Sequence, residues 1–245
     1  AVGYAAGYAV TTGYDNTLVG TSAGATLTTG YYNTYIGKTA GSGATTAAHS
    51  NVGIGLGALS SAHGAGNVAI GRGALSSTTD ANQVAIGYSA LEANTSGEKN
   101  TAIGYQALQA NTTGNYNVAI GHEALEANVG GYGNVAIGYH AMATAAPAAT
   151  TGYNVAIGYE ALYDLTDGVY NTAIGWGAGH NVTTGDNSVI IGNNAGQAMT
   201  TQNENVLIGQ IAGQDLTGQY NVFVGSAAGY NATSADNNVV IGRQA

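Results

Sequence analysis

The chain has 245 residues and a formal net charge of −9, and only 7% of its residues are charged. Four Lys and Arg residues cannot build a basic surface for a nucleic-acid backbone, and the absence of cysteine excludes disulfides and thiolate metal sites. No apolar run reaches the roughly 18 residues that a membrane-spanning helix needs. We therefore expect no nucleic-acid partner and no membrane insertion.

A short phrase, Asn-Val-Ala-Ile-Gly with an alanine three residues after the glycine, recurs along the whole sequence. Its glycines, from Gly3 to Gly242, are separated by 14 intervals of about 17 residues each. The glycines are Gly3, Gly20, Gly37, Gly55, Gly71, Gly87, Gly104, Gly121, Gly138, Gly158, Gly175, Gly192, Gly209, Gly225 and Gly242. So short a repeat indicates one supersecondary unit stacked on itself. We interpret residues 1–245 as a single continuous array, part of a longer fibre.

Each repeat predicts its own local structure. The residue before the glycine is Ile or Val, and the residue three before it is Val or Thr, from 17–19 to 239–241. This alternation predicts a short strand, and the glycine bends the chain after it. The recurrent alanine should begin a second extended stretch, followed by turns such as 94–97. The prediction is an all-β fold, a parallel β-solenoid or flattened β-roll, with coils about 4.8 Å apart.

Asparagine lies four residues before the glycine in nearly every copy. Because asparagine is unfavourable in strands, we predict a structural ladder in which each amide bonds to the same amide one coil away. Gln83 and Ser188 are the exceptions. The predicted ladder residues are Asn16, Asn33, Asn51, Asn67, Asn100, Asn117, Asn134, Asn154, Asn171, Asn205, Asn221 and Asn238.

The middle residue of each predicted strand points to the opposite face from its neighbours, and it is apolar too. One face can line the roll, and the other then requires a partner. We therefore expect a homotrimer, intertwined or side by side. The residues assigned to the oligomer seam are Ala69, Ala85, Ala102, Ala119, Ala136, Ala156, Ala173, Leu207 and Phe223.

The phrase N-V-A-I-G-x-x-A resembles the head repeats of trimeric autotransporter adhesins. The longer form, Asn100 to Gly114, resembles arrays of phage tail-fibre-like proteins. This resemblance implies a trimeric β-roll located outside a cell, on its surface or on a virion. A host-surface glycan or protein receptor would then be a partner besides further copies of the chain.

An aromatic row follows the glycines at Tyr88, Tyr105, Tyr139, Tyr159 and Trp176. These side chains are candidate glycan contacts, because rings stack on sugars, although the favoured interpretation is that they pack on one another between coils or across the oligomer seam. The histidines fall at different phases of the repeat, so we predict no metal site and no cofactor. The acidic residues are scattered as well, which predicts no catalytic residues and no enzyme.

We predict the structural shaft of an extracellular or virion-attached fibre, tail-fibre-like or adhesin-like, that serves attachment. The first alternative is an extracellular filament whose subunits stack end to end, and the second is a glycan- or ice-binding solenoid surface. The one irregular step, between Gly138 and Gly158, contains the only proline, Pro147, in a predicted outward loop.

Overall fold

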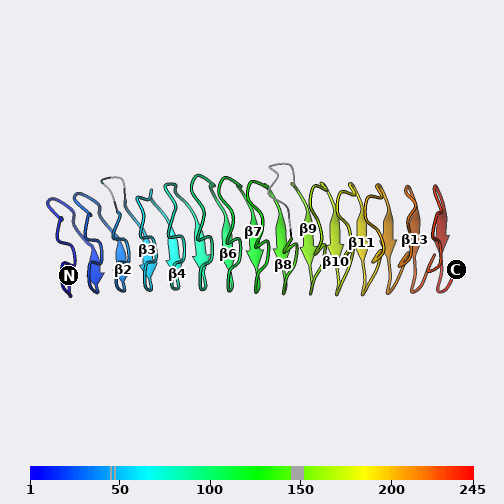
Figure 1. Ribbon diagram of the computed structural model, residues 1–245, viewed down its shortest axis with the longest axis horizontal. Helices are drawn as coiled ribbons and strands as arrows, with labels where there is room; N and C mark the ends of the chain where they lie inside the picture. The colour runs from blue at the N-terminus through cyan, green and yellow to red at the C-terminus, as the bar shows by residue number, and fades with distance from the viewer. Residues whose placement is uncertain (45, 47, 145–151) are drawn as a thin grey trace. The chain divides into compact units, whose positions relative to one another are not determined.

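The computed structural model describes residues 1–44, 46, 48–144 and 152–245. The predicted loop at Pro147 lies outside these residues. The chain forms two compact units, Ala1–Asn117 and Val118–Ala245, which are described separately. Every named element in the described part is a three-residue strand (Figure 1). The described residues contain no helix able to cross a membrane.

Each strand pairs in parallel with the next one in its unit, without a shift in register. Ala69 lies beside Ala85 in the first unit, and Leu207 lies beside Phe223 in the second. Strands of the first unit are β1 (Thr17–Val19), β2 (Thr34–Ile36), β3 (Val52–Ile54), β4 (Val68–Ile70), β5 (Val84–Ile86) and β6 (Thr101–Ile103). Strands of the second are β7 (Val118–Ile120), β8 (Val135–Ile137), β9 (Val155–Ile157), β10 (Thr172–Ile174), β11 (Val189–Ile191), β12 (Val206–Ile208), β13 (Val222–Val224) and β14 (Val239–Ile241).

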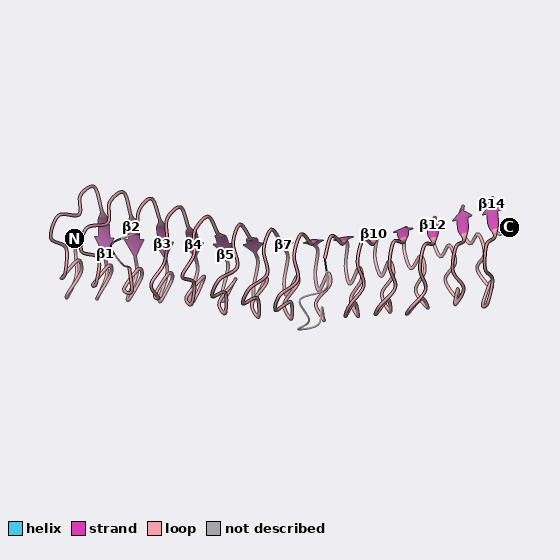
Figure 2. Cartoon of the chain, turned by 90° about the horizontal axis from the view of Figure 1, so that it is seen from above, coloured by secondary structure: helices cyan, strands magenta, loops and turns pink. Residues whose placement is uncertain are grey.

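Identical positions of successive repeats therefore stack, and each unit is a parallel β-solenoid with about 17 residues per coil, as the sequence predicts. Within each coil the strand forms one side, and turns and loops complete the circuit (Figure 2). The hydrogen bonds between coils continue beyond the strands. The backbone N–H of Leu125, for example, donates to the carbonyl of Ala141 at 3.0 Å.

The predicted second strand is wrong. The segment that begins near the recurrent alanine is a run of turns, because residues on both sides of that alanine adopt left-handed backbone angles. Glu123 has a φ of 54° and Leu125 a φ of 53°, with Ala124 buried between them. Left-handed residues reverse the chain direction, so the segment curls over the core instead of extending.

The glycine after each strand is required by the spacing of the coils. Gly175 has a φ of +138°, and a Cβ built on it would lie 2.6 Å from the carbonyl oxygen of Gly192 in the next coil. Only a residue without a side chain fits this approach. The predicted role of the glycine is confirmed.

The predicted oligomer seam is wrong, because its residues face the interior of their own chain. In β8, Ala136 is fully buried while Val135 and Ile137 remain partly exposed on the other face. The same inversion applies to the whole assigned row, all of it fully buried within one chain: Ala69, Ala85, Ala102, Ala119, Ala136, Ala156, Ala173, Leu207 and Phe223. A side chain enclosed in this way cannot contact a second copy.

The core maintains its volume by exchanging large and small residues between two rows. Where the middle strand residue is small, as Ala102 is, the residue four after the glycine is large and buried, as Leu108 is. Where the strand residue is large, as Phe223 is, the second position is glycine. A Cβ on Gly229 would overlap the Phe223 ring, whose atoms are its three nearest neighbours. Interiors are close-packed, so one row compensates the other.

One coil combines two small residues, Ala173 and Gly179. Its space is filled from the neighbouring coil, because a Cβ on Gly179 would lie 2.9 Å from the Cδ1 atom of Ile190. The compensation thus operates between coils as well as within them.

The predicted asparagine ladder is present, and it is buried except at its two ends, where Asn16 is half-buried and Asn238 is exposed. The backbone N–H of Asn154 donates to Oδ1 of Asn134 at 3.0 Å, and its own Nδ2 donates to the carbonyl of Gly168 at 2.9 Å. Oδ1 of Asn154 then accepts from the backbone N–H of Asn171 at 2.9 Å. Each amide therefore joins its strand to the next coil and also closes a turn.

The two exceptions in the row preserve the pattern of bonds. Oε1 of Gln83 accepts from the backbone N–H of Asn100 at 3.0 Å. Oγ of Ser188 accepts from the backbone N–H of Asn205 at 3.2 Å. What the position requires is an acceptor of suitable reach, which explains why these two residue types replace asparagine.

A second buried polar ladder was missed by the sequence analysis. Nδ2 of Asn111 donates to Oδ1 of Asn94 at 2.7 Å, and Nδ2 of Asn94 donates to Oγ1 of Thr78 at 3.3 Å. All three residues are fully buried. They lie seven residues after the glycine, in turns rich in polar residues. Because such turns are typically exposed, their composition did not indicate a buried ladder.

We predict that Asn154→Ala lowers the free energy of unfolding by about 3 kcal/mol, because it leaves the carbonyl of Gly168 and the N–H of Asn171 buried without partners. Urea unfolding followed by circular dichroism measures the change. Asn115→Ala is the control, since Asn115 is only half-buried and its hydrogen bonds lie at the exposed surface of loops. Equal losses in the two variants would contradict a special role for the ladder.

The compensation between Phe223 and Gly229 predicts strong coupling. Phe223→Ala alone leaves a cavity and should cost about 3–5 kcal/mol, and Gly229→Leu alone overpacks the same space. The double variant reproduces the Ala and Leu pair of the other coils, so it should lose clearly less stability than the sum of the single changes. A double-mutant cycle in urea tests this, and strict additivity would contradict it.

Candidate functional site

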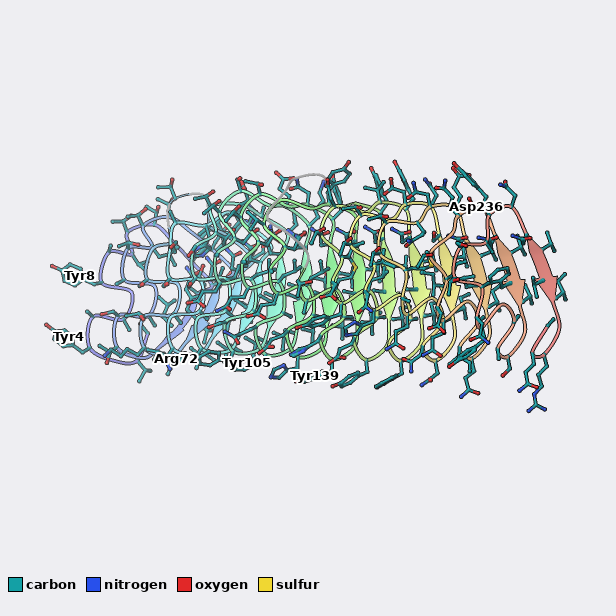
Figure 3. The ribbon with its side chains drawn as sticks, turned by 45° about the vertical axis from the view of Figure 1, so that its right-hand side comes forward. Tyr4, Tyr8, Arg72, Tyr105, Tyr139 and Asp236 are labelled. Carbon is teal, nitrogen blue, oxygen red and sulfur yellow. The ribbon has the colours of Figure 1, made fainter. Side chains whose placement is uncertain are left out.

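Three surface features carry chemistry, and the first is the aromatic row. Arg72, Tyr105 and Tyr139 each project outward from their coils (Figure 3). In the first unit Tyr88 stacks on Tyr105 with ring centroids 5.4 Å apart, and the Arg72 guanidinium lies 5.5 Å from the Tyr88 centroid. These rings are 42% and 43% exposed.

The second unit contains the other three aromatic residues. Tyr139 stacks on Tyr159 at 5.1 Å, and Tyr159 stacks on Trp176 at 5.8 Å. Rings in such a stack direct their faces at each other and their edges at solvent. Packing of the rings on one another is therefore observed, whereas glycan contact, which needs an open ring face, stays a prediction.

The second feature is the outward face of the strands, formed by the first and third residue of each. Ile36, Ile70 and Ile174 keep between 36% and 37% of their surface exposed. None of these outward positions in the 14 described strands carries a charged residue. Each unit thus presents a flat strip of Val, Thr and Ile side chains.

The third feature is a cluster of histidines and carboxylates at the turn after β7 and β8. Nε2 of His140 lies 2.6 Å from Oε2 of Glu123, and Nδ1 of His122 lies 3.6 Å from Oε1 of Glu123. The two imidazole rings are 5.7 Å apart. The prediction that the histidines lie apart is wrong for this pair. His122 is the first residue after its glycine and His140 is the second after its own, and such neighbouring positions in successive coils lie diagonally beside each other.

Other ionisable groups lie along the same edge. Burial, and next the charge of Glu123, raise the pKa of Glu126. Farther along, Nε2 of His180 lies 3.4 Å from Oε2 of Glu160, and its Nδ1 lies 3.9 Å from Oδ2 of Asp164. The sequence predicted that the acidic residues are scattered, and it did not indicate the histidines that lie beside Glu123, Glu160 and Asp164.

A buried polar pair lies within the first unit. The Tyr35 hydroxyl is 2.7 Å from Nε2 of His63, and Nδ1 of His63 is 2.7 Å from the Ser61 carbonyl. A carbonyl only accepts, so Nδ1 carries the proton and Nε2 accepts from the hydroxyl. Burial raises the pKa of Tyr35 and lowers that of His63, so both remain neutral. The pair is part of the core.

A cavity of about 650 Å³ opens at the last coil, lined by core residues that include Phe223 and Val240. Its lining combines such core residues with exposed ones, among them Tyr230, Asn231 and Gln244, and contains no charged side chain.

The stacked coils define the class to which this chain belongs, the parallel β-solenoid repeat proteins. No protein-family model, curated protein or solved structure matches the chain. The resemblance to adhesin heads and tail-fibre arrays therefore depends on the repeat phrase alone.

His63 predicts an acid-sensitive core. Its pKa in the folded state lies below the ordinary 6.5, because burial disfavours the charged ring. As pH falls through 6.5, His63 takes up a proton in the unfolded chain before it does so in the folded chain. Its contribution to the free energy of unfolding is therefore constant above this pH and declines below it. Urea unfolding on both sides of pH 6.5 should show a smaller decline in His63→Gln than in the wild type or in His49→Gln. Equal declines in all three would contradict the assignment.

Proposed function

We propose that this chain is the structural shaft of an extracellular or virion-attached fibre, in which copies associate side by side through the outward strand face. The uncharged Val, Thr and Ile strip carries the proposal. An apolar strip that extends over every strand of a unit is typical of an interaction surface. The oligomer seam is thereby moved from the buried alanine row to the opposite face of the same strands.

The size of each strip can be compared with that of a standard interface between two proteins. Three strand residues make a strip about 10 Å wide, and each coil adds about 4.8 Å of length. The projected area is about 290 Å² for the strip of the first unit and about 380 Å² for that of the second. Either strip alone thus supplies about a third to a half of the roughly 800 Å² that each partner contributes to a standard interface.

Self-association also fits the chemistry of the strip. In a trimer, three strips of β-branched side chains would face a common axis and pack against one another there, as the inner faces of packed sheets do. Closed symmetry limits growth, and the resemblance to trimeric adhesin heads favours three copies about an axis. Ile36, for example, would then be covered on the surface that a single chain leaves open.

A mechanical role follows from the bonding within each unit. Successive coils within a unit are joined by strand bonds and turn bonds, and most of them also by a buried amide such as that of Asn154. Such a shaft transmits force and positions other parts of a fibre, so recognition of a glycan or protein receptor would be assigned to loops or tips. The stacked ring faces do not favour the glycan- or ice-binding alternative.

Mass photometry and negative-stain microscopy of the purified chain test the proposal. We expect three times the chain mass and particles of one length. Ile174→Glu combined with Ile208→Glu places charges on the strip and should yield single chains that keep their β-sheet circular dichroism. Thr184→Glu, an exposed turn position in the same unit, should leave the trimer intact.

Three results would overturn the side-by-side fibre. The first is a wild-type chain that stays monomeric at micromolar concentration, and the second is a double variant that retains the trimer mass. The third is filaments whose length increases with concentration, which would support end-to-end assembly as the function.

A further inference from the structure

The His122, Glu123 and His140 cluster combines the ligand types that zinc prefers. One donor atom from each of the three residues lies within 4.8 Å of the other two. We propose that this cluster is a binding site for a divalent transition-metal ion, with Zn²⁺ the best fit. Two imidazoles and one carboxylate are a known zinc ligand set, with water as the fourth ligand.

One of the two contacts in the cluster has the length that tetrahedral coordination needs. Ligand atoms located 2.0–2.2 Å from zinc at tetrahedral angles are about 3.4 Å from one another. Nδ1 of His122 and Oε1 of Glu123 are 3.6 Å apart, and Nε2 of His140 and Oε2 of Glu123 are 2.6 Å apart. An ion would therefore have to separate the His140 ring from the Glu123 carboxylate by about 0.8 Å.

The nitrogen of His140 supplies an independent indication. Nε2 is buried, yet it makes no well-aligned hydrogen bond among the described residues, although Oε2 of Glu123 is close. A buried ring nitrogen without an aligned partner carries an energetic cost. A metal ion between the imidazole and the carboxylate would satisfy both groups.

The backbone and the neighbouring rings position the ligands in advance. The N–H of His140 donates to the carbonyl of His122 at 3.0 Å, which fixes the two coils relative to each other at this point. The His140 ring stacks on Tyr139 at 3.9 Å, and the His122 ring stacks on the same tyrosine at 5.2 Å. This packing restricts the imidazole rotamers and lowers the entropic cost of binding.

The site lies in the turns that follow β7 and β8, and none of its three residues belongs to the strand strip, so the two proposals are tested with different variants. A bound ion would join two successive coils of the second unit through side chains. It would therefore stabilise the folded state in proportion to its concentration.

Isothermal titration of the untagged full-length chain with Zn²⁺ tests the site. We expect one ion per chain in the wild type and at least about tenfold weaker binding in Glu123→Gln and in His140→Gln. Co²⁺ should give the visible absorption of a tetrahedral complex in the wild type and in His180→Gln, but not in the two cluster variants. His180→Gln is the matched control, because it removes a histidine from a similar carboxylate contact in the same unit, and it should bind like the wild type.

A second readout guards against unfolding of the variants. Zn²⁺ should raise the melting temperature of the wild type and of His180→Gln, but not of Glu123→Gln or His140→Gln. The proposal is overturned if the wild type binds no Zn²⁺. It is equally overturned if binding is unchanged in the two cluster variants, which would leave the cluster as an ion pair.

Discussion

The stacking of each buried amide on the same position one coil away is the interaction on which the rest of this structure depends. A buried amide is unfavourable unless its donors and acceptor are all engaged, and the repeat engages them by placing a partner on both sides. Asn154 shows the whole pattern, accepting from Asn171 while donating to Asn134 and to a turn carbonyl. A shift of register by one residue would separate every such pair in a unit, so the ladder specifies register as well as stability.

Once the register is specified, equivalent residues of successive coils lie in rows along the unit, and these rows determine how the core is packed. A side chain is packed mainly by its own equivalents and by the row opposite, so a change in one row is tolerated only if the other compensates. Ala102 with Leu108 and Phe223 with Gly229 are two solutions to the same volume requirement. The leucines of this second row, such as Leu108 with a φ of 53°, also accept a left-handed backbone that glycine adopts freely. Burial of the large side chain offsets that strain.

The sequence predicted the strands, the required glycines and the first ladder, because each depends on one position repeated at a fixed interval. It did not predict which strand face is internal, since Val135, Ala136 and Ile137 are all apolar and period two cannot choose between faces. The internal face could have been identified from the sequence, because large and small residues alternate between the middle strand position and the position four after the glycine. Seeing this requires the two positions to be compared copy by copy. The His122 and His140 contact was missed for a related reason, because it joins neighbouring rows diagonally.

The inverted face alters the argument for assembly more than it alters the fold. Alanines at a seam would bring chains close together but would contribute little apolar area. The β-branched residues of the actual outward face contribute more, and they belong to a chain in which only 7% of residues are charged. So uncharged a strip, with Ile174 more than a third exposed, would promote uncontrolled association in a free monomer. The closed oligomer that we propose would cover the strip and remove that hazard, so the same residues that are costly in a single chain are the ones that favour assembly.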